Sequence, residues 1–213
     1  MSWLDRDHLY AEVGVACAKI ARNSARAGRC GVEFLAGIPG TLGGALAMNA
    51  GAFGGETWSR VAGVETVDRF GVVRQRQPSE FEIGYRHVKG ELGEWFLSAE
   101  LELENGDVEA AQREIKRLLE RRAATQPTKQ PSCGSVFRNP PDDHAARLIE
   151  SIGLKGRRIG GAQVSEKHAN FIVNTGDATA ADIEQLIALV QDEVERQTGV
   201  RLVTEVHRIG EAS

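Results

Sequence analysis

The sequence lacks the signature motifs of several common enzyme sites. No glycine is followed by lysine, which excludes a Walker A loop, and neither GxSxG nor HExxH occurs. No window approaches the ~18 consecutive apolar residues of a membrane span. The first seven residues carry three charges with no apolar stretch after them. We therefore expect no membrane partner, no secretory signal and no metal site.

Cysteine is scarce and shows no paired pattern. The three cysteines, Cys17, Cys30 and Cys133, are far apart and have no CxxC spacing. An odd number of widely spaced cysteines is typical of free thiols in a reducing compartment, not of a disulfide framework. The pattern therefore predicts a cytoplasmic protein.

Aromatic residues and net charge are both low. Aromatics make up 6% of the chain, and 26 Lys+Arg stand against 30 Asp+Glu, a net charge of −4. Single-strand binding needs aromatic platforms, and phosphate neutralisation needs a basic face. We expect no nucleic-acid partner.

Hydrophobic residues make up 41% of the chain, which excludes a largely disordered protein. Its 213 residues are enough for two small domains.

The N-terminal part of the chain reads as a mixture of helices and strands. An alanine-rich stretch at about 10–29 predicts a helix. Val64–Asp68 and Val72–Arg76 flank a Gly-containing turn and predict a hairpin. Phe96–Glu104 alternates with period two and predicts a half-buried strand, and Val108–Thr125 has a helical apolar stripe.

The pattern of apolar and polar residues changes at Gln126-Pro127, and we expect a second α+β unit after this point. Helices are predicted from Ala145 to Ile152 and from Thr179, which opens a capping box, to Gly199. Strands are predicted at 170–174 and 201–209. The fold class is therefore α+β, with domains at 1–126 and 127–213.

Glycine is the residue in marked excess, with 24 residues against about 15 at the usual ~7% share. Seven of them fall in the nineteen residues Gly37–Gly55. Glycine lets backbone amides approach a phosphate or an electron-rich ring closely. Tight turns and close packing are the alternative explanation, and the spacing is not the dinucleotide-binding GxGxxG.

Three further segments contain residue types that carry chemistry. Ser132 and Ser135 lie in a Gly-containing turn, where a hydroxyl can act as a nucleophile or proton donor, or be an ordinary turn residue. Glu205 alternates with apolar residues in the last expected strand, which is costly unless the carboxylate is paired, functional or exposed at the strand end. Tyr85-Arg86-His87 fits an anion clamp or a solvated loop.

Five segments, taken in order, closely resemble the MurB family of UDP-N-acetylenolpyruvoylglucosamine reductases. They are GIPGTLGGALAMNAGAFG, YRH, SCGSVFRNPP, IGGAQVSEKHANFIVN and EVHRIGE, and the resemblance covers the chain from about Val13 to Glu211. The resemblance implies a partial FAD-binding domain of the PCMH type followed by a MurB-type substrate-binding domain. It implies a cytoplasmic flavoprotein of peptidoglycan precursor synthesis. Such an enzyme uses NADPH and FAD to reduce UDP-N-acetylglucosamine enolpyruvate to UDP-N-acetylmuramate.

The resemblance also implies roles for single residues. Ser135 matches the family's proton donor, Glu205 its catalytic glutamate and Arg86 the arginine that stabilises developing charge. Tyr85, Asn139 and His168 match positions near the substrate, Asn139 at the diphosphate and His168 at the carboxylate. The residues that would lie against FAD are Gly40, Thr41, Gly43, Gly44, Asn49, Ala50 and Gly51.

One part of the family's pattern has no counterpart in this sequence. The Gly-Ser-Asn segment that holds the FAD pyrophosphate does not occur, and the resemblance begins at Val13. Two hypotheses follow: a reductase, complete or part of a complete enzyme, or a non-catalytic remnant that binds UDP-sugar through residues 127–213. Flavin bands in the visible spectrum of the purified protein would separate them.

We expect this chain to bind FAD more weakly than a full-length relative, because charge-assisted pyrophosphate contacts are missing. We also expect exposed apolar surface around residues 15–50 and, with it, self-association. Dialysis of FAD-loaded protein, followed by absorbance, measures the first expectation. Retention of one FAD per chain would contradict it.

Overall fold

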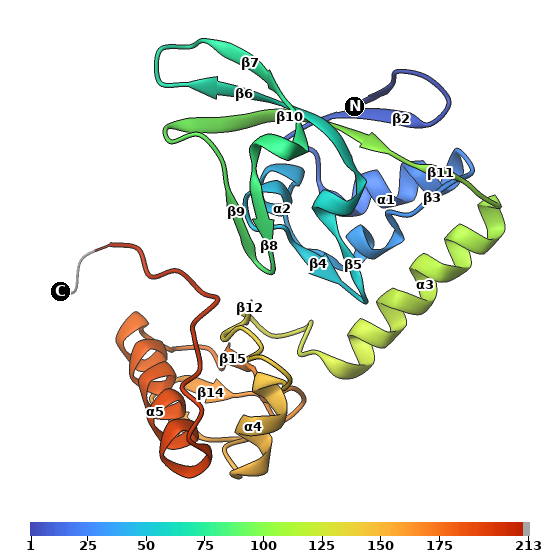
Figure 1. Cartoon of the computed structure of the whole chain (residues 1–213). Helices are drawn as coiled ribbons and strands as arrows, with labels where there is room; N and C mark the ends of the chain where they lie inside the picture. The colour runs from blue at the N-terminus through green and yellow to red at the C-terminus, as the bar shows by residue number, and fades with distance from the viewer. Residues whose placement is uncertain (211–213) are drawn as a thin grey trace. The chain divides into compact units, whose positions relative to one another are not determined.

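The chain packs as two compact units. The computed structural model describes residues 1–210, and the units are Met1–Arg121 and the part that begins at Arg122 (Figure 1). The boundary lies inside helix α3 (Val108–Thr125), which has the bounds that the sequence predicted. The assignment of ligand-binding domains at 1–126 and 127–213 stays a prediction. No helix among the described residues is long and apolar enough to cross a membrane.

An antiparallel sheet of five strands forms the frame of the first unit. The strands lie in the order β1 (Ser2–Trp3), β2 (His8–Glu12), β10 (Glu94–Glu102), β6 (Val61–Asp68) and β7 (Val73–Arg76). β10 is central, since Ala99 pairs with Ala11 on one side and with Val64 on the other. A register shift between Phe96 and Ser98 adds local twist to this strand.

The hairpin and the central strand that the sequence predicted are both present. Between β6 and β7, Gly71 has φ 81°, and the Asp68 carboxylate accepts hydrogen bonds from the N–H groups of Phe70 (2.9 Å) and Val72 (3.0 Å). The turn therefore combines a left-handed glycine with an aspartate that satisfies its amides. β10 begins and ends two residues earlier than the expected Phe96–Glu104.

The helix expected at about 10–29 is wrong in its first third. Residues 8–12 form β2, and helix α1 extends only over Cys17–Arg26. Leu9 and Ala11 alternate into the core and pair with β10, so strand pairing prevails over the helix propensity of the alanines. The chain leaves α1 through Gly28, which has φ 68°.

Short elements complete the first unit. They are β3 (Arg29–Cys30), η1 (Glu33–Gly37), α2 (Leu42–Ala47), β4 (Gly51–Ala52), β5 (Gly55–Glu56), η2 (Thr57–Arg60), η3 (Pro78–Glu80), β8 (Glu82–Gly84), β9 (His87–Lys89) and β11 (Glu104–Asn105). β4 pairs with β5, β8 with β9 and β3 with β11.

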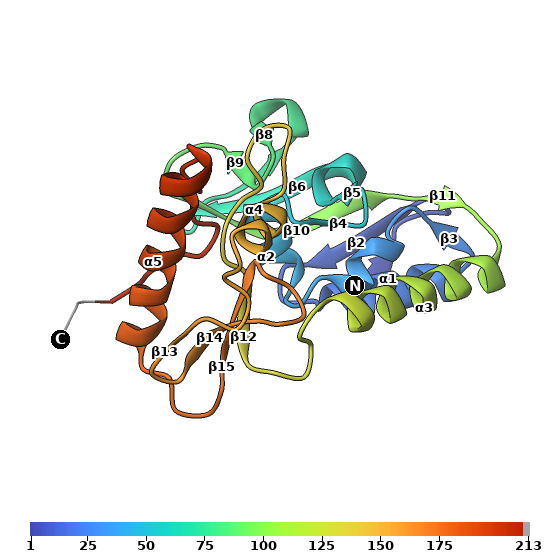
Figure 2. The same ribbon diagram turned by 90° about the horizontal axis from the view of Figure 1, so that it is seen from below.

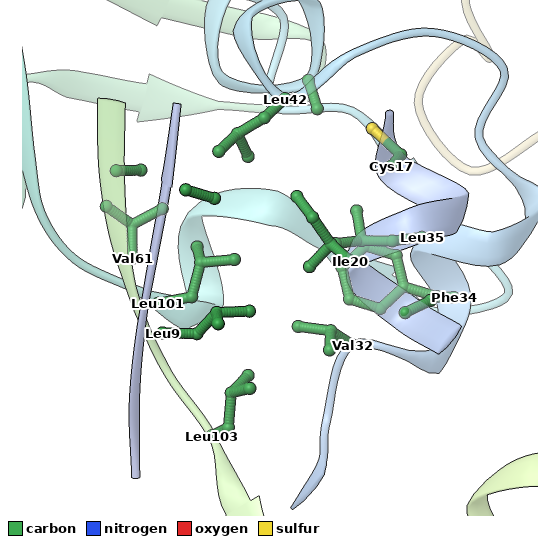
Figure 3. Packing of buried hydrophobic residues seen from close by; sticks show 14 of the residues in the cluster. Leu9, Cys17, Ile20, Val32, Phe34, Leu35, Leu42, Val61, Leu101 and Leu103 are labelled. Atoms are coloured by element: carbon green, nitrogen blue, oxygen red, sulfur yellow. The ribbon is translucent and has the colours of Figure 1, made fainter. Parts of the chain in front are cut away.

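The core of the first unit lies between one face of this sheet and α1. Leu9 and Leu101 from the sheet point toward Ile20 of α1, with Leu35 and Leu42 beside them (Figure 3). All five side chains are at most 1% exposed. Full burial of each such side chain is worth about 1.5–3 kcal/mol, so this layer is the main stabilising contact of the unit.

The expected apolar surface around residues 15–50 is wrong. Among the described residues, the large apolar side chains that stay exposed lie outside that range, with Phe70 at 75% and Leu92 at 88% the most exposed in the first unit. Leu42 and Leu46 of α2 are fully buried, as is Ile20. These side chains are part of the core of the first unit, where residues of the sheet also lie.

A polar cluster fixes the β7 side of the sheet. The Glu94 side chain is 7% exposed and accepts hydrogen bonds from the Arg76 guanidinium (2.7 Å to Nη2) and the Thr66 hydroxyl (2.6 Å). These two donors hold the pKa of the Glu94 carboxyl below its usual 4.5, because they favour the ionised form. Arg76 also pairs with Glu80, which ties η3 to the sheet.

The second unit is a four-stranded antiparallel sheet with two helices. The sheet order is β12 (Ser132–Ser135), β15 (Phe171–Asn174), β14 (Ala162–Val164) and β13 (Arg158–Ile159). Helix α5 (Ala180–Thr198) lies against β13 and β14, as the second view also shows (Figure 2). The shorter helix α4 (Ala145–Ser151) packs against α5.

The helix ends in this unit are those the sequence predicted. Thr179 and Asp182 form the capping box of α5, and Gly199 ends the helix with φ 73°. Gly153 follows α4 with φ 75°. In both cases the left-handed C-terminal position is taken by glycine, which has no Cβ to clash.

The strand expected at 201–209 is wrong. Within the described residues this segment makes one isolated bridge, between Thr204 and Phe137, and no ladder. Val203 is 61% exposed and Ile209 is 95% exposed, so the alternating residues do not line a buried face. Glu205 therefore does not sit on a strand among apolar neighbours.

We predict that Glu94→Gln lowers the melting temperature at pH 7 by on the order of 4 °C, because the charge-assisted bonds from Arg76 are lost. The folded-state pKa of Glu94 is depressed, so its stabilisation is present above pH 4.5 and is lost as pH falls through the folded-state pKa. Thermal unfolding of wild type and variant between pH 7 and pH 3 should show the difference shrinking at acid pH. Glu102→Gln, at an exposed position of the same strand, is the matched control. A pH-independent difference would contradict the prediction.

Candidate active site

The glycine-rich segment 37–55 is held in place by the backbone that follows β2. The N–H of Gly43 donates to the carbonyl of Val13 (2.9 Å), and the N–H of Cys17 donates to the carbonyl of Gly40 (3.0 Å). Gly40 has φ 125°, a conformation that a side chain would strain. The segment is therefore a defined structure and not a loose loop.

One face of α2 carries only small, exposed residues. Thr41, Gly44 and Ala47 are three residues apart, share a helix face and are exposed, as is Gly40 just before them. A Cβ added at Gly40 or Gly44 would have no heavy atom within 4 Å. This small-residue face would let a flat ring approach the backbone.

Other residues of the expected FAD-binding set have packing roles. A Cβ at Gly43 would lie 3.0 Å from a valine Cβ, and one at Gly51 would lie 2.6 Å from the carbonyl oxygen of Gly55. The carbonyl of Ala50 accepts hydrogen bonds from the N–H (3.0 Å) and the hydroxyl (2.7 Å) of Thr57. These three positions are constrained by the protein itself.

Asn49 is buried, at 2% exposed, and has a left-handed backbone with φ 43°. Its Nδ2 donates to the Glu56 carboxylate (2.9 Å) and to the carbonyl of Gly84 (3.1 Å), and its Oδ1 accepts from the N–H of Trp58 (3.1 Å). The side chain thus joins the glycine-rich segment to the end of β8. A contact between Asn49 and FAD stays a prediction.

Arg86 lies against the same segment. Its Nη2 donates to the carbonyl of Gly51 (2.8 Å) and its Nη1 to the carbonyl of Asn49 (3.3 Å). The Arg86 guanidinium carbon is 5.0 Å from the centre of the Tyr85 ring, which is a cation–π distance. The structure therefore brings Arg86 and Tyr85 together with the expected flavin-binding residues of the first unit.

In the second unit, the backbone of Glu205 pairs with the residue that follows Ser135. Ser135 is half-buried at the end of β12, directly after Gly134, which has φ 84°. The carbonyl of the next residue, Val136, accepts a hydrogen bond from the N–H of Glu205 (2.8 Å). The backbone pairing places Glu205 beside the residue that follows Ser135.

Asn139 is exposed and lies six residues before the start of α4. Its Oδ1 accepts a hydrogen bond from the N–H of Ala145 (3.1 Å), so its amide nitrogen is the group directed elsewhere. The neighbouring Arg138 has a buried Nε that makes no hydrogen bond within the part of the chain that the structure describes. Arg138, a cation beside Asn139, is not marked by any pattern in the sequence, because a buried donor without a partner can be recognised only in the structure.

His168 is half-buried, and its ring lies 4.8 Å from that of Phe171 in an edge-on contact. Nδ1 accepts a hydrogen bond from the N–H of Asn170 (3.3 Å), which leaves the proton on Nε2. Burial, and then the positive charge of Lys155, lower the pKa of His168 from its usual 6.5. At pH 7 the ring is therefore a neutral donor.

We predict that His168 titrates below 6.5, as ring proton shifts in an NMR titration would show. Lys155→Ala should raise the pKa of His168 by removing a positive charge, but not fully to 6.5, because burial remains. An unperturbed or raised pKa in the wild-type chain would contradict this account of the ring.

Comparison with known proteins covers both units. A profile described as "FAD binding domain" matches residues 2–75, and one described as "UDP-N-acetylenolpyruvoylglucosamine reductase, C-terminal domain" matches residues 126–209. The similarity thus includes residues before Val13, where the motif-based resemblance began. Together with the structure, these matches confirm the expected α+β chain with an FAD-binding module followed by a MurB-type C-terminal domain.

Several curated relatives are closely similar to the chain, and each is named UDP-N-acetylenolpyruvoylglucosamine reductase. The relative from Alkalilimnicola ehrlichii is 65% identical over 98% of this chain and 70% of its own length. The relative from Methylococcus capsulatus is 67% identical over 96% of this chain and 67% of its own length. The relative from Legionella pneumophila is 59% identical over 100% of this chain and 70% of its own length. The chain thus spans about 70% of the length of these relatives.

A solved structure leads to the same family. The crystal structure of UDP-N-acetylenolpyruvylglucosamine reductase (MurB) from Thermus caldophilus superposes with a TM-score of 0.85 at 35% identity, over 95% of this chain and 73% of that one. With the relatives above, this match confirms the resemblance found in the sequence. The chain belongs to the UDP-N-acetylenolpyruvoylglucosamine reductase family.

Proposed function

We propose that this chain reduces the enolpyruvyl ether of UDP-N-acetylglucosamine to UDP-N-acetylmuramate, with FAD as cofactor and NADPH as reductant, in peptidoglycan precursor synthesis. The observation that carries the proposal is the similarity of the chain, over nearly its whole length, to UDP-N-acetylenolpyruvoylglucosamine reductases. The hydrogen bond from the Glu205 N–H to the Val136 carbonyl supports it, because it pairs the backbone of Glu205 with the residue that follows Ser135. The non-catalytic alternative is not favoured, because the family matches include the FAD-binding domain.

The first unit has a surface that fits a flavin. The small residues Gly40, Thr41, Gly44 and Ala47 are exposed, and a Cβ added at Gly40 or Gly44 would have no heavy atom within 4 Å. A flat ring could therefore lie close to the backbone here. These residues would hold the ring system, and Gly43, Gly51 and Asn49 would keep the surrounding backbone in shape. When bound there, FAD would supply the hydride-transfer chemistry between NADPH and the electron-poor double bond of the substrate.

In this proposal Arg86 stabilises negative charge. Hydride addition to the terminal carbon leaves negative charge spread over the neighbouring carbon and its carboxylate. The guanidinium of Arg86 is fixed by the carbonyls of Gly51 and Asn49 and keeps its planar array of donors in one orientation. A fixed cation stabilises developing charge without having to reorganise.

Ser135 is the proposed proton donor. The carbon next to the carboxylate must receive a proton to give the product, and the Ser135 hydroxyl is the group assigned to deliver it. Glu205 orients that hydroxyl or relays the proton to it. Gly134, which has a left-handed backbone, directly precedes Ser135, and the Glu205–Val136 hydrogen bond joins the segment that bears Ser135 to the segment that bears Glu205.

The remaining residues are proposed to bind the substrate. Neutral His168, with its proton on Nε2, donates a hydrogen bond to the carboxylate, and the free amide nitrogen of Asn139 donates to the diphosphate. The exposed Tyr85 ring covers Arg86 from one side. The cytoplasm is the proposed compartment, in keeping with three free cysteines in the structure.

In the FAD-loaded protein, we predict that Ser135→Ala leaves flavin reduction by NADPH unchanged and slows reoxidation by the enolpyruvyl substrate ~10²–10⁴-fold. Hydride transfer into FAD needs no acid at the substrate carbon, whereas the second half-reaction ends with a new carbon-bound proton. Stopped-flow absorbance of the flavin measures the two half-reactions separately.

The variants that accompany Ser135→Ala sharpen the test. Ser135→Cys should be milder, since a thiol still donates a proton, and Glu205→Gln should affect the same half-reaction. Arg86→Ala should weaken substrate binding as well. The proton-donor assignment would have to be abandoned if Ser135→Ala slowed reduction by NADPH and spared reoxidation.

A further inference from the structure

Asn170 is a buried asparagine that none of the assigned roles uses. It is 4% exposed, and its side-chain amide faces the backbone of Phe137. Its Oδ1 accepts a hydrogen bond from the Phe137 N–H (3.0 Å), and its Nδ2 donates to the Phe137 carbonyl (2.8 Å). The side chain thus takes the place that a residue of a neighbouring antiparallel strand would occupy.

The backbone of Asn170 is also engaged. Its carbonyl accepts a hydrogen bond from the Val136 N–H (2.9 Å), and its N–H donates to Nδ1 of His168 (3.3 Å). Both backbone groups and the side chain therefore contact either the segment that follows Ser135 or the His168 ring. Asn170 is therefore bonded to His168 and to the segment that connects Ser135 with the backbone of Glu205.

The opposite edge of the same segment carries Glu205. The Val136 carbonyl accepts from the Glu205 N–H, and the N–H of Arg138 donates to the carbonyl of Val203 (2.8 Å). Residues 136–138 are therefore fixed on one edge by Asn170 and on the other by the segment that bears Glu205. A displacement of the Asn170 edge would therefore be transmitted to the Glu205 edge through residues 136–138.

We propose that Asn170 is a positioning residue for Ser135 and Glu205. The proposal rests on the function proposed above, in which these two residues deliver the proton. Loss of the side-chain amide would leave the buried N–H and carbonyl of Phe137 without partners, and segment 136–138 would shift to satisfy them. The bond to His168 comes from the Asn170 backbone, so the state of the His168 ring should be unaffected.

Two substitutions and one control test the positioning role by NMR on the full chain. Asn170→Ala removes both bonds to Phe137, and Asn170→Asp keeps the acceptor but not the donor. Asn174→Ala is the matched control, because Asn174 ends β15, the strand that begins directly after Asn170, and its Oδ1 accepts from the N–H groups of Gly176 (2.8 Å) and Ala178 (3.1 Å). It removes two bonds of the same kind away from Ser135.

In Asn170→Ala, amide hydrogen exchange at Phe137 and Glu205 should be ~10–100-fold faster than in wild type. Asn170→Asp should be intermediate, Asn174→Ala should leave both amides unchanged, and the His168 ring nitrogen shifts should stay constant. Unchanged exchange at Phe137 and Glu205 in Asn170→Ala would overturn the proposal. So would a uniform loss of protection across the unit with altered His168 shifts in Asn170→Asp, since that is a purely structural effect.

Kinetics on FAD-loaded protein form the second arm. Asn170→Asp should slow flavin reoxidation by the enolpyruvyl substrate at least ~10-fold, with reduction by NADPH and the substrate KM little changed. A normal reoxidation rate would overturn the positioning role. If wild type itself shows no substrate-dependent reoxidation, the proposed function fails, whereas the exchange data still decide whether Asn170 sets the geometry of Ser135 and Glu205.

Discussion

The second unit depends on satisfying the backbone of Val136 and Phe137 from two sides. Buried N–H and carbonyl groups that find no partner are expensive, so a short segment bonded along both edges has little freedom to move. One edge is occupied by Asn170 and the other by residues 203–205. The C-terminal segment is not a strand, yet it is fixed at the points where it presents Glu205.

The first unit uses a similar device around Arg86. Asn49, Arg86 and Phe53 have positive φ, a conformation that costs a non-glycine residue on the order of 1–2 kcal/mol. Such strain persists where the surroundings over-determine it. Here the Asn49 amide holds Gly84 and Trp58, and Arg86 in turn holds the carbonyls of Asn49 and Gly51. A buried amide that serves backbone groups thus organises the candidate residues in each unit.

Local chemistry made much of this predictable from sequence. The hairpin at Gly71, the capping box at Thr179 and the glycine at 199 are set by a few adjacent residues, and they were located correctly. Residues 8–12 and 201–209 were misassigned because their conformations are set by partners far away in the chain, β10 and Phe137. The motifs identified the family and its candidate residues. The motifs gave no role to Asn170 or Arg138. The sequence does not reveal that the side-chain amide of Asn170 bonds the Phe137 backbone as a strand would, or that the buried Nε of Arg138 has no hydrogen-bond partner among the described residues.

The position of β10 in the chain has a consequence for the order of folding. Ala11 pairs with Ala99, so β2 can join the sheet only after β10, near the end of the first unit, has been synthesised. The core between α1 and the sheet cannot form before that. The hairpin β6–β7 is complete earlier in synthesis, and until β10 follows, β6 has no strand on its other side. During synthesis from the N-terminus, the glycine-rich segment must therefore remain without its finished scaffold until β10 has left the ribosome.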